Sequence, residues 1–344
     1  MQSTIETSPA PQPGRILWID TARCIGMFAI YLGHMGNAAG RAYPFVYMFH
    51  VPLFFFLAGC TEALQVAVPF FSGIIRAAKK ILVPWLVFCV LTVIVALLTG
   101  ECRTADLPGR LKIIALGTTR NRFVGGALWF LTCLFVVKVL FSALRFLPSK
   151  VWIAVGSLII FSFALWAFDI NRPVLPYNID SALYYLLFYT AGYLLLPLNR
   201  ALSVKKKLFR PAAAGCACLC LIYGGFAFWG HDPLQMIYDI ALLGSVARVV
   251  SALVLIGLVL AVSKLLEPVS FLRRAGQESL YLCGGEYIVK ALMGAGAGLF
   301  GLQLSPSTLL GSILYCCAAM ALCFLFFLPL GKRLLQRTGA SAAG

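Results

Sequence analysis

Long, uninterrupted runs of apolar residues constrain this chain more than any other feature of its sequence. The runs are roughly 18 to 25 residues long, which is the length an α-helix needs to cross about 30 Å of hydrocarbon. Of the 344 residues, 61% are hydrophobic and 12% are charged. Soluble domains have about 45–50% apolar and about 25% charged residues, so a soluble fold could not bury this much apolar surface. We therefore predict an all-α membrane protein.

The runs predict a polytopic bundle of about ten transmembrane helices. We place the spans at residues 16–36, 43–64, 80–100, 126–147, 150–169, 179–198, 211–230, 240–263, 277–300 and 307–331. An even number of spans puts both termini on one side of the membrane. Seventeen Lys and Arg residues fall on that side and seven on the other, so we expect both termini to be cytoplasmic. The net charge of +16 is then explained by loops that lie against anionic lipid, rather than by nucleic-acid binding.

The chain divides into one large domain and two tails. Residues 1–14 are polar and Pro-rich, so we predict a disordered cytoplasmic tail; they lack the pattern of a cleaved signal peptide. We assign residues 15–337 to a membrane domain and 338–344 to a short cytoplasmic tail. The 101–125 connection is long and basic, and we expect it to form a re-entrant or amphipathic segment that folds back over the bundle.

The twelve cysteines do not predict a metal site. Eleven lie inside predicted spans, where cysteine behaves as a small hydrophobic residue. Cys216, Cys218 and Cys220 are spaced by two, which places neighbours on nearly opposite faces of a helix. We expect no metal to bind there, because zinc needs ligands that converge.

Ionisable residues inside the spans are the strongest candidates for function, because each is costly in lipid unless it faces protein or water. The candidates are Asp20, Arg23, His34, His50, Glu62, Lys138, Arg248, Glu286 and Lys290. Arg23 and His34 are eleven residues apart, so they share one helix face at about 16 Å along the axis. Asp20 and Arg23 form either a buried ion pair or part of a site.

A functional role is favoured for His34, since imidazole exchanges protons near neutral pH. For Glu62, Lys138 and Arg248 we favour ion pairs between helices or side chains that extend to the interface.

The first two spans carry specific motifs. The segment RILWIDTARCIGMFAIYLGHM contains Trp-Ile-Asp, ending at Asp20, followed by an Arg, ten residues, His pattern formed by Arg23 and His34. The segment YMFHVPLFFFLAG contains His50 in a Phe-His-x-Pro-Leu-Phe-Phe-Phe-x-x-Gly pattern. These motifs resemble those of the acyltransferase 3 family, in particular the branch related to fucose 4-O-acetylase, with Ala58 where that family has Ser. RAAKKILVPW and ALWFL are similar to the family's third and fourth helices.

The resemblance implies a membrane-bound O-acyltransferase. Such an enzyme moves an acyl group, here expected to be acetyl, from acyl-CoA to a hydroxyl of a carbohydrate, glycan or lipid-linked acceptor. His34 would act as the general base or as a transient acyl carrier, with His50 nearby, and Asp20 and Arg23 would orient the donor. Acyl-CoA is then a donor substrate, and we expect no permanently bound cofactor. The expected location is the bacterial cytoplasmic membrane.

Several further residues have two interpretations. Arg76, Lys79 and Lys80 would bind the phosphates of coenzyme A, or they are ordinary positive-inside loop charges. Trp129 is a substrate contact or a packing aromatic residue. Where the family often has a His seven residues after a Ser-Leu pair, this chain has Glu286, which either serves the site or pairs with Lys290.

One alternative function comes from a different class of protein. A secondary transporter, or an export protein for a small polar solute or glycan precursor, would also place charged residues within ten spans. Internal repeats and helices broken at the midplane would favour it, and neither is evident in the sequence.

Overall fold

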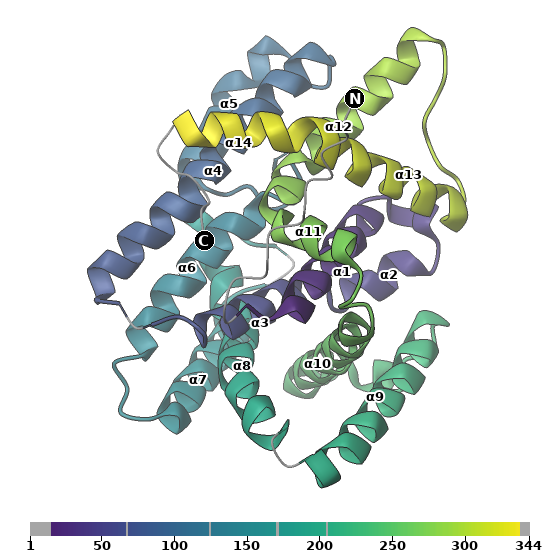
Figure 1. Ribbon diagram of the computed structural model, residues 1–344. Coiled ribbons are helices and arrows are strands. Elements are labelled where there is room, and N and C mark those ends of the chain that lie inside the picture. The colour runs from purple at the N-terminus through teal and green to yellow at the C-terminus, as the bar shows by residue number, and fades with distance from the viewer. Residues whose placement is uncertain (1–14, 67, 124, 170–171, 204–205, 338–344) are drawn as a thin grey trace, which may run out of the picture.

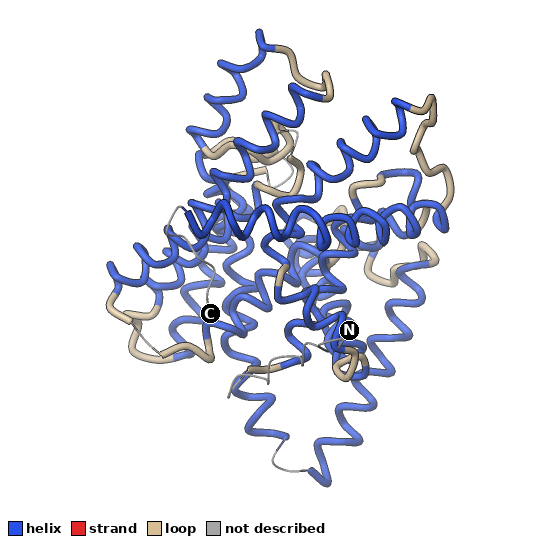
Figure 2. The backbone as a smooth tube through the Cα atoms, turned by 45° about the horizontal axis from the view of Figure 1, so that its top comes forward, coloured by secondary structure: helices blue, strands red, loops and turns tan. Residues whose placement is uncertain are grey.

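The computed structural model describes residues 15–337 except residues 67, 124, 170–171 and 204–205, and both predicted tails lie outside this part. Within it every regular element is helical, as predicted (Figures 1 and 2). The α-helices are α1 (Leu17–Gly33), α2 (Ala42–Tyr47), α3 (His50–Glu62), α4 (Phe70–Leu98), α5 (Leu107–Leu116), α6 (Trp129–Leu144), α7 (Lys150–Ala167), α8 (Ile179–Ser203), α9 (Lys206–Phe228), α10 (Ala241–Leu265), α11 (Ser270–Gln277), α12 (Ser279–Leu299), α13 (Leu309–Leu322) and α14 (Leu328–Arg337). Four 3₁₀ segments and one π-helical segment complete the described elements: η1 (Gly36–Ala39), η2 (Thr104–Asp106), η3 (Pro176–Asn178), η4 (Gln235–Ile237) and η5 (Cys323–Phe327).

Six helical segments of the described chain are long and apolar enough to cross a membrane: Ala42–Glu62, Phe70–Leu98, Lys150–Ala167, Pro176–Pro197, Leu243–Leu265 and Leu309–Gln336. Trp129–Leu144 and Ala213–Phe228 are shorter apolar helices. Helices α1 and α12 are not among these segments, and they are the helices that carry Asp20, Arg23, Glu286 and Lys290. The number of ten spans and the cytoplasmic termini stay predictions.

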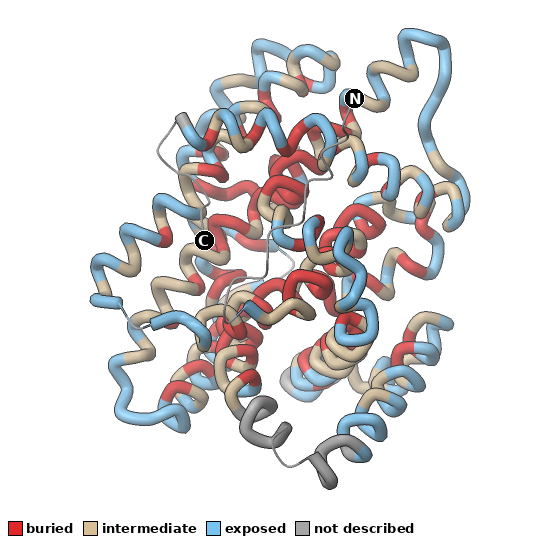
Figure 3. Tube along the Cα trace, viewed as in Figure 1, coloured by how far each residue is buried: buried red, intermediate tan, exposed pale blue. Residues whose placement is uncertain are grey.

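Helix α1 lies at the centre of the bundle, where it packs against α2, α3, α10, α11, α12 and α13 (Figure 1). Buried residues gather around it, and exposed residues lie towards the rim (Figure 3). Much of the rim is apolar: α7 exposes Val151, Val155, Leu158 and Trp166. A membrane explains the apolar rim, because exposed apolar side chains are favourable in contact with lipid and unfavourable in contact with water.

Helices α3 and α8 cross at two glycines. A Cβ added to Gly59 would lie 1.9 Å from the carbonyl oxygen of Tyr189, and one added to Gly192 would lie 1.9 Å from that of Phe56. The two backbones therefore approach as closely as small residues at membrane helix crossings allow. This crossing fixes α3, the helix that begins with His50.

The predicted span 43–64 differs from the structure in one respect, since it forms two helices with a turn at Met48 and Phe49. Pro52 explains where α3 begins. It lies in the first helical turn, where its missing N–H has no intrahelical partner to lose. The break places His50 at the N-terminus of a helix rather than in the middle of one.

Helix α4 begins at Phe70, ten residues before the predicted span. Its 29 residues extend for about 43 Å, which exceeds the roughly 30 Å of hydrocarbon. Its first turns, which carry Arg76 and Lys80, can therefore project beyond the apolar layer.

The 101–125 segment contacts the bundle through its end, where Thr118, Thr119 and Phe123 are buried, and its re-entrant or amphipathic character stays a prediction. It contains η2 and α5, and α5 packs against α4. Buried Asn178 ties the end of this segment to the start of α6, because its side-chain amide donates to the Gly117 carbonyl at 3.0 Å and to Thr132 Oγ1 at 2.8 Å. This arrangement brings Arg120 and Phe123 close to the fourth predicted span.

Candidate active site

His34 contacts a carboxylate from a distant part of the chain. It directly follows α1, and its Nδ1 lies 3.2 Å from Oε2 of Glu286 on α12. The other carboxylate oxygen, Oε1, lies 2.5 Å from Lys290 Nζ, which also donates to the Tyr31 carbonyl at 3.0 Å. The predicted pairing of Glu286 with Lys290 is confirmed, and the same carboxylate also holds the imidazole.

The contact with Glu286 determines what the imidazole can do. A carboxylate at Nδ1 favours the tautomer with a proton on that nitrogen, which leaves Nε2 as the proton acceptor. Glu286 is buried, whereas the His34 side chain is 23% exposed. His34 therefore has a buried carboxylate partner at Nδ1, while its side chain is partly exposed.

His34 lies in the wall of two adjoining cavities. The larger, of about 800 Å³, is also lined by His50 and Trp129. The smaller, of about 390 Å³, is lined by Glu286 and Lys290. Gly126 borders both, and a Cβ at this position would lie 3.3 Å from His34 Cε1. A glycine here lets the chain that precedes α6 approach the imidazole.

His50 lines the same cavity as His34, as expected, and Trp129 lines it too. His50 is buried, and its Nδ1 lies 2.6 Å from the Val46 carbonyl oxygen, so its other ring nitrogen is the one available to a ligand. The guanidinium of Arg120 lies over the Trp129 ring, 4.5 Å from its centroid. Trp129 thus combines a packing role with a position in the cavity wall.

The large cavity also contains polar residues for which the sequence offers no motif. Arg120 and Arg248 line it, and Arg248 lies 5.5 Å from the centroid of the Tyr238 ring. Burial and a hydrogen bond to Asp232 raise the pKa of the Tyr238 hydroxyl, so this hydroxyl stays protonated at neutral pH. The cavity presents aromatic rings and hydrogen-bond donors, a combination that suits a polar organic ligand.

A third cavity, of about 770 Å³, is lined by residues of α1, α3, α4 and α6. Arg23, Arg76 and Lys80 line it, which brings three of the predicted donor-binding residues together. Lys79 is exposed and is not among the lining residues. Asp20 is buried and lies 3.5 Å from Arg23 Nη1 and 2.7 Å from Arg15 Nε. Asp20 therefore positions Arg23 and reaches the cavity only through it.

Aromatic residues of α3 lie between the positions that line the two large cavities. Along α3, His50 and Val51 line the cavity of His34, whereas Ala58 and Glu62 line the cavity of Arg23. Phe54 and Phe55 lie between these positions, and both contact the ring of Phe130 on α6, with centroids 5.7 and 5.0 Å apart. From His50 to Ala58 the helix rises about 12 Å. A ligand that reached both cavities would pass this aromatic wall.

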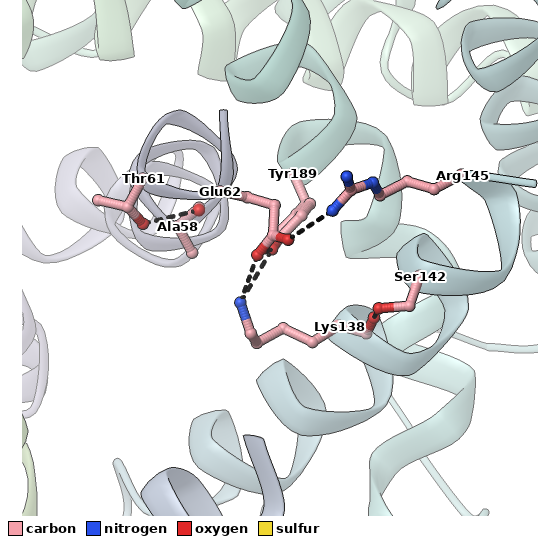
Figure 4. A network of polar contacts seen from close by, with 7 residues as sticks. All are labelled: Ala58, Thr61, Glu62, Lys138, Ser142, Arg145 and Tyr189. Carbon is pink, nitrogen blue, oxygen red and sulfur yellow. Dashed lines mark hydrogen bonds and ion pairs between the residues drawn. The ribbon is translucent and has the colours of Figure 1, made fainter. Parts of the chain in front are cut away.

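The expected ion pair between helices occurs at Glu62. Lys138 Nζ of α6 lies 2.7 Å from Glu62 Oε2, and Arg145 Nη1 lies 3.4 Å from Oε1 (Figure 4). Arg248, by contrast, lies over a ring and makes no ion pair among the described residues.

No group of three His, Cys, Asp or Glu side chains suited to a metal occurs within the described part of the chain.

Comparison with known proteins decides between the classes that the geometry allows. The family model described as an acyltransferase domain, that of acyltransferase 3, matches residues 16–328. The chain belongs to the acyltransferase 3 family. It is also 26% identical to nodulation protein NolL of Mesorhizobium japonicum over 249 residues, which cover 67% of this chain and 62% of that relative. No solved structure matches.

Membership of the acyltransferase 3 family favours an acyltransferase over the transporter of the alternative interpretation, and the described chain has helices long and apolar enough to cross a membrane. The Arg23 and His34 motif and the His50 motif both lie within the matched region. The sequence does not indicate that Glu286 lies beside His34, or that Lys138 and Arg145 line a cavity. For all three residues the sequence shows only an ionisable side chain in or near an apolar span. That pattern does not identify the residue that the side chain contacts.

Proposed function

We propose that this acyltransferase moves an acetyl group from acetyl-CoA to a hydroxyl of a carbohydrate, glycan or lipid-linked acceptor at the bacterial cytoplasmic membrane. The observation that carries the proposal is the contact between His34 and Glu286 in the wall of a cavity that also holds His50. An imidazole with a carboxylate on Nδ1 and a free Nε2 is the arrangement of a general base.

In this proposal His34 Nε2 removes the proton from the acceptor hydroxyl as the oxygen attacks the thioester carbonyl. The carbon–sulfur bond breaks, the ester forms, and the imidazolium returns its proton to the departing thiolate of coenzyme A. Glu286 stabilises the imidazolium, and Lys290 holds Glu286 in place. His50 and Trp129 would contact the acceptor.

The donor would bind in the cavity of Arg23, Arg76 and Lys80. Clustered cations suit phosphates, and the positive-inside prediction puts this cavity on the cytoplasmic side, where acyl-CoA is made. The pantetheine arm would pass the Phe54 and Phe130 wall towards His34. The acceptor would occupy the cavity of about 800 Å³ on the opposite side.

The test is release of coenzyme A from acetyl-CoA by the purified full chain, with and without an acceptor panel that includes neutral, acidic and lipid-linked glycans. The proposal predicts acceptor-dependent release and an acetylated product. A burst of one coenzyme A per enzyme without acceptor would instead assign His34 as an acyl carrier. Transfer to an amine and not to any hydroxyl would contradict the proposal.

A further inference from the structure

The donor cavity has a second basic wall that the proposed contacts do not use. Lys138 of α6 and Arg145, which directly follows α6, line the cavity, and both contact Glu62 of α3 (Figure 4). The Tyr189 hydroxyl donates to Glu62 Oε2 at 2.9 Å, and Lys138 Nζ donates to the Tyr189 hydroxyl at 3.2 Å. One carboxylate therefore holds two cations at the edge of an open cavity.

The charges around this cavity do not balance. Arg23, Arg76, Lys80, Lys138 and Arg145 line it, and Glu62 is the one carboxylate among the described lining residues. Arg76 and Lys80 make no ion pair within the described part of the chain. Like charges gathered around a shared space repel one another, so a polyanion that entered would be bound strongly.

The cations form two pairs on neighbouring helices. Arg76 and Lys80 are four residues apart on α4. Lys138 of α6 and Arg145, the helical residue that caps the C-terminus of α6, are seven apart, so each pair shares one helix face. Helices α4 and α6 pack against each other. The cavity thus offers two separate anion-binding positions rather than one.

We propose that Lys138 and Arg145 bind the 3′-phosphate of the coenzyme A donor, and that Glu62 holds them in place while the cavity is empty. The inference rests on the proposed donor. Arg23 shares the α1 face that leads to His34, so the diphosphate, which carries the pantetheine arm, lies with Arg23, Arg76 and Lys80. The α6 pair remains for the other phosphate, and the enzyme selects acyl-CoA over donors that lack a 3′-phosphate.

Glu62 distinguishes this role from a purely structural one. If Glu62 only links α3 to α6, Glu62→Gln loosens the fold and does not improve binding of coenzyme A. If Glu62 competes with a phosphate for two cations, the same substitution frees them and tightens binding of coenzyme A. The two interpretations therefore predict opposite signs for one measurement.

The experiment measures binding of coenzyme A and of 3′-dephospho-coenzyme A to the purified full chain by calorimetry at one ionic strength. The wild type should bind coenzyme A about tenfold or more tightly than 3′-dephospho-coenzyme A, which is the gain in affinity expected from a charge-assisted contact. Lys138→Met and Arg145→Met should each reduce this preference by weakening the binding of coenzyme A without changing the binding of 3′-dephospho-coenzyme A. Glu62→Gln should increase the preference for coenzyme A severalfold. Lys150→Met removes an exposed lysine outside the cavity and should behave as wild type.

Each contrary result has a distinct meaning. Equal affinity of the wild type for both ligands overturns this inference and leaves the proposed function standing. Lys138→Met and Arg145→Met variants that weaken both ligands equally also overturn it. If the wild type binds neither ligand, the proposed donor fails and the inference fails with it. Should Lys138→Met not fold, Arg145→Met at the C-terminal end of α6 and Glu62→Gln still decide the question.

Discussion

Oε2 of Glu286 lies 3.2 Å from Nδ1 of His34, and this contact joins α12 to the end of α1. The carboxylate is buried and is held from its other side by Lys290. The relationship has the geometry by which a carboxylate orients a catalytic imidazole, and it makes the role of each partner testable.

Glu286 should contribute to the rate of transfer rather than to donor binding. Glu286→Gln should lower kcat by on the order of 10²–10³-fold, because the amide cannot stabilise the imidazolium, and should leave the KM for acetyl-CoA nearly unchanged. Steady-state kinetics checks this. The substitution also leaves Lys290 without its counter-ion, so the Glu286→Gln, Lys290→Met double variant serves as the control. A double variant that regains both stability and activity would reduce Glu286 to a structural ion pair.

Donor binding should depend on α4. Replacing Arg76 and Lys80 together by Ala should raise the KM for acetyl-CoA by roughly 10–100-fold and lower kcat less, because contacts with remote phosphates stabilise ground and transition states alike. Lys79→Ala should raise KM less than the pair does, since Lys79 does not line the cavity. An unchanged KM in the double variant would return Arg76 and Lys80 to the class of ordinary loop charges.

The α3 and α8 crossing should tolerate no side chain at Gly192. Gly192→Ala puts a Cβ against the Phe56 carbonyl and should destabilise the fold by about 1–3 kcal/mol, seen as a lower melting temperature in detergent. Gly215→Ala on α9 is the matched control, because nothing lies within 4 Å of the added Cβ. Equal melting temperatures for the two variants would mean that the helices cross less closely than described.

Topology can be tested independently of chemistry. Tags at residue 5, within residues 200–210 and at residue 340 should all report a cytoplasmic location, and a tag at residue 233 should report the opposite side. Accessibility labelling of intact cells measures this. A tag within 200–210 that reports outside would show that the number of spans is not ten.

The sequence predicts the helical membrane fold because apolar length is a local property. Arg23 and His34 could be assigned to one helix face for the same reason. The partner of His34 could not be predicted, since the packing of α12 on α1 depends on side chains along both helices. The aromatic wall at Phe54 and Phe130 is likewise a product of how α3 and α6 meet.

The ion pair at Glu62 shows a subtler limit. Its existence was predictable, because a lone carboxylate in a span requires a partner. Its place at the edge of a cavity was not, because a cavity is formed by several helices at once. The turn at Met48 and Phe49 was missed because the apolar run continues through it, although Pro52 marks the start of α3.

The specific activity of His34→Ala per folded molecule, recorded beside a melting curve, tests most directly whether His34 is the general base. Transfer should fall by on the order of 10²–10⁴-fold, while stability stays close to that of the wild type. His50→Ala is the comparison and should also damage activity. A His34→Ala protein that retains more than about a tenth of wild-type specific activity, above the range for loss of a general base, would exclude His34 as the base and shift the assignment to His50.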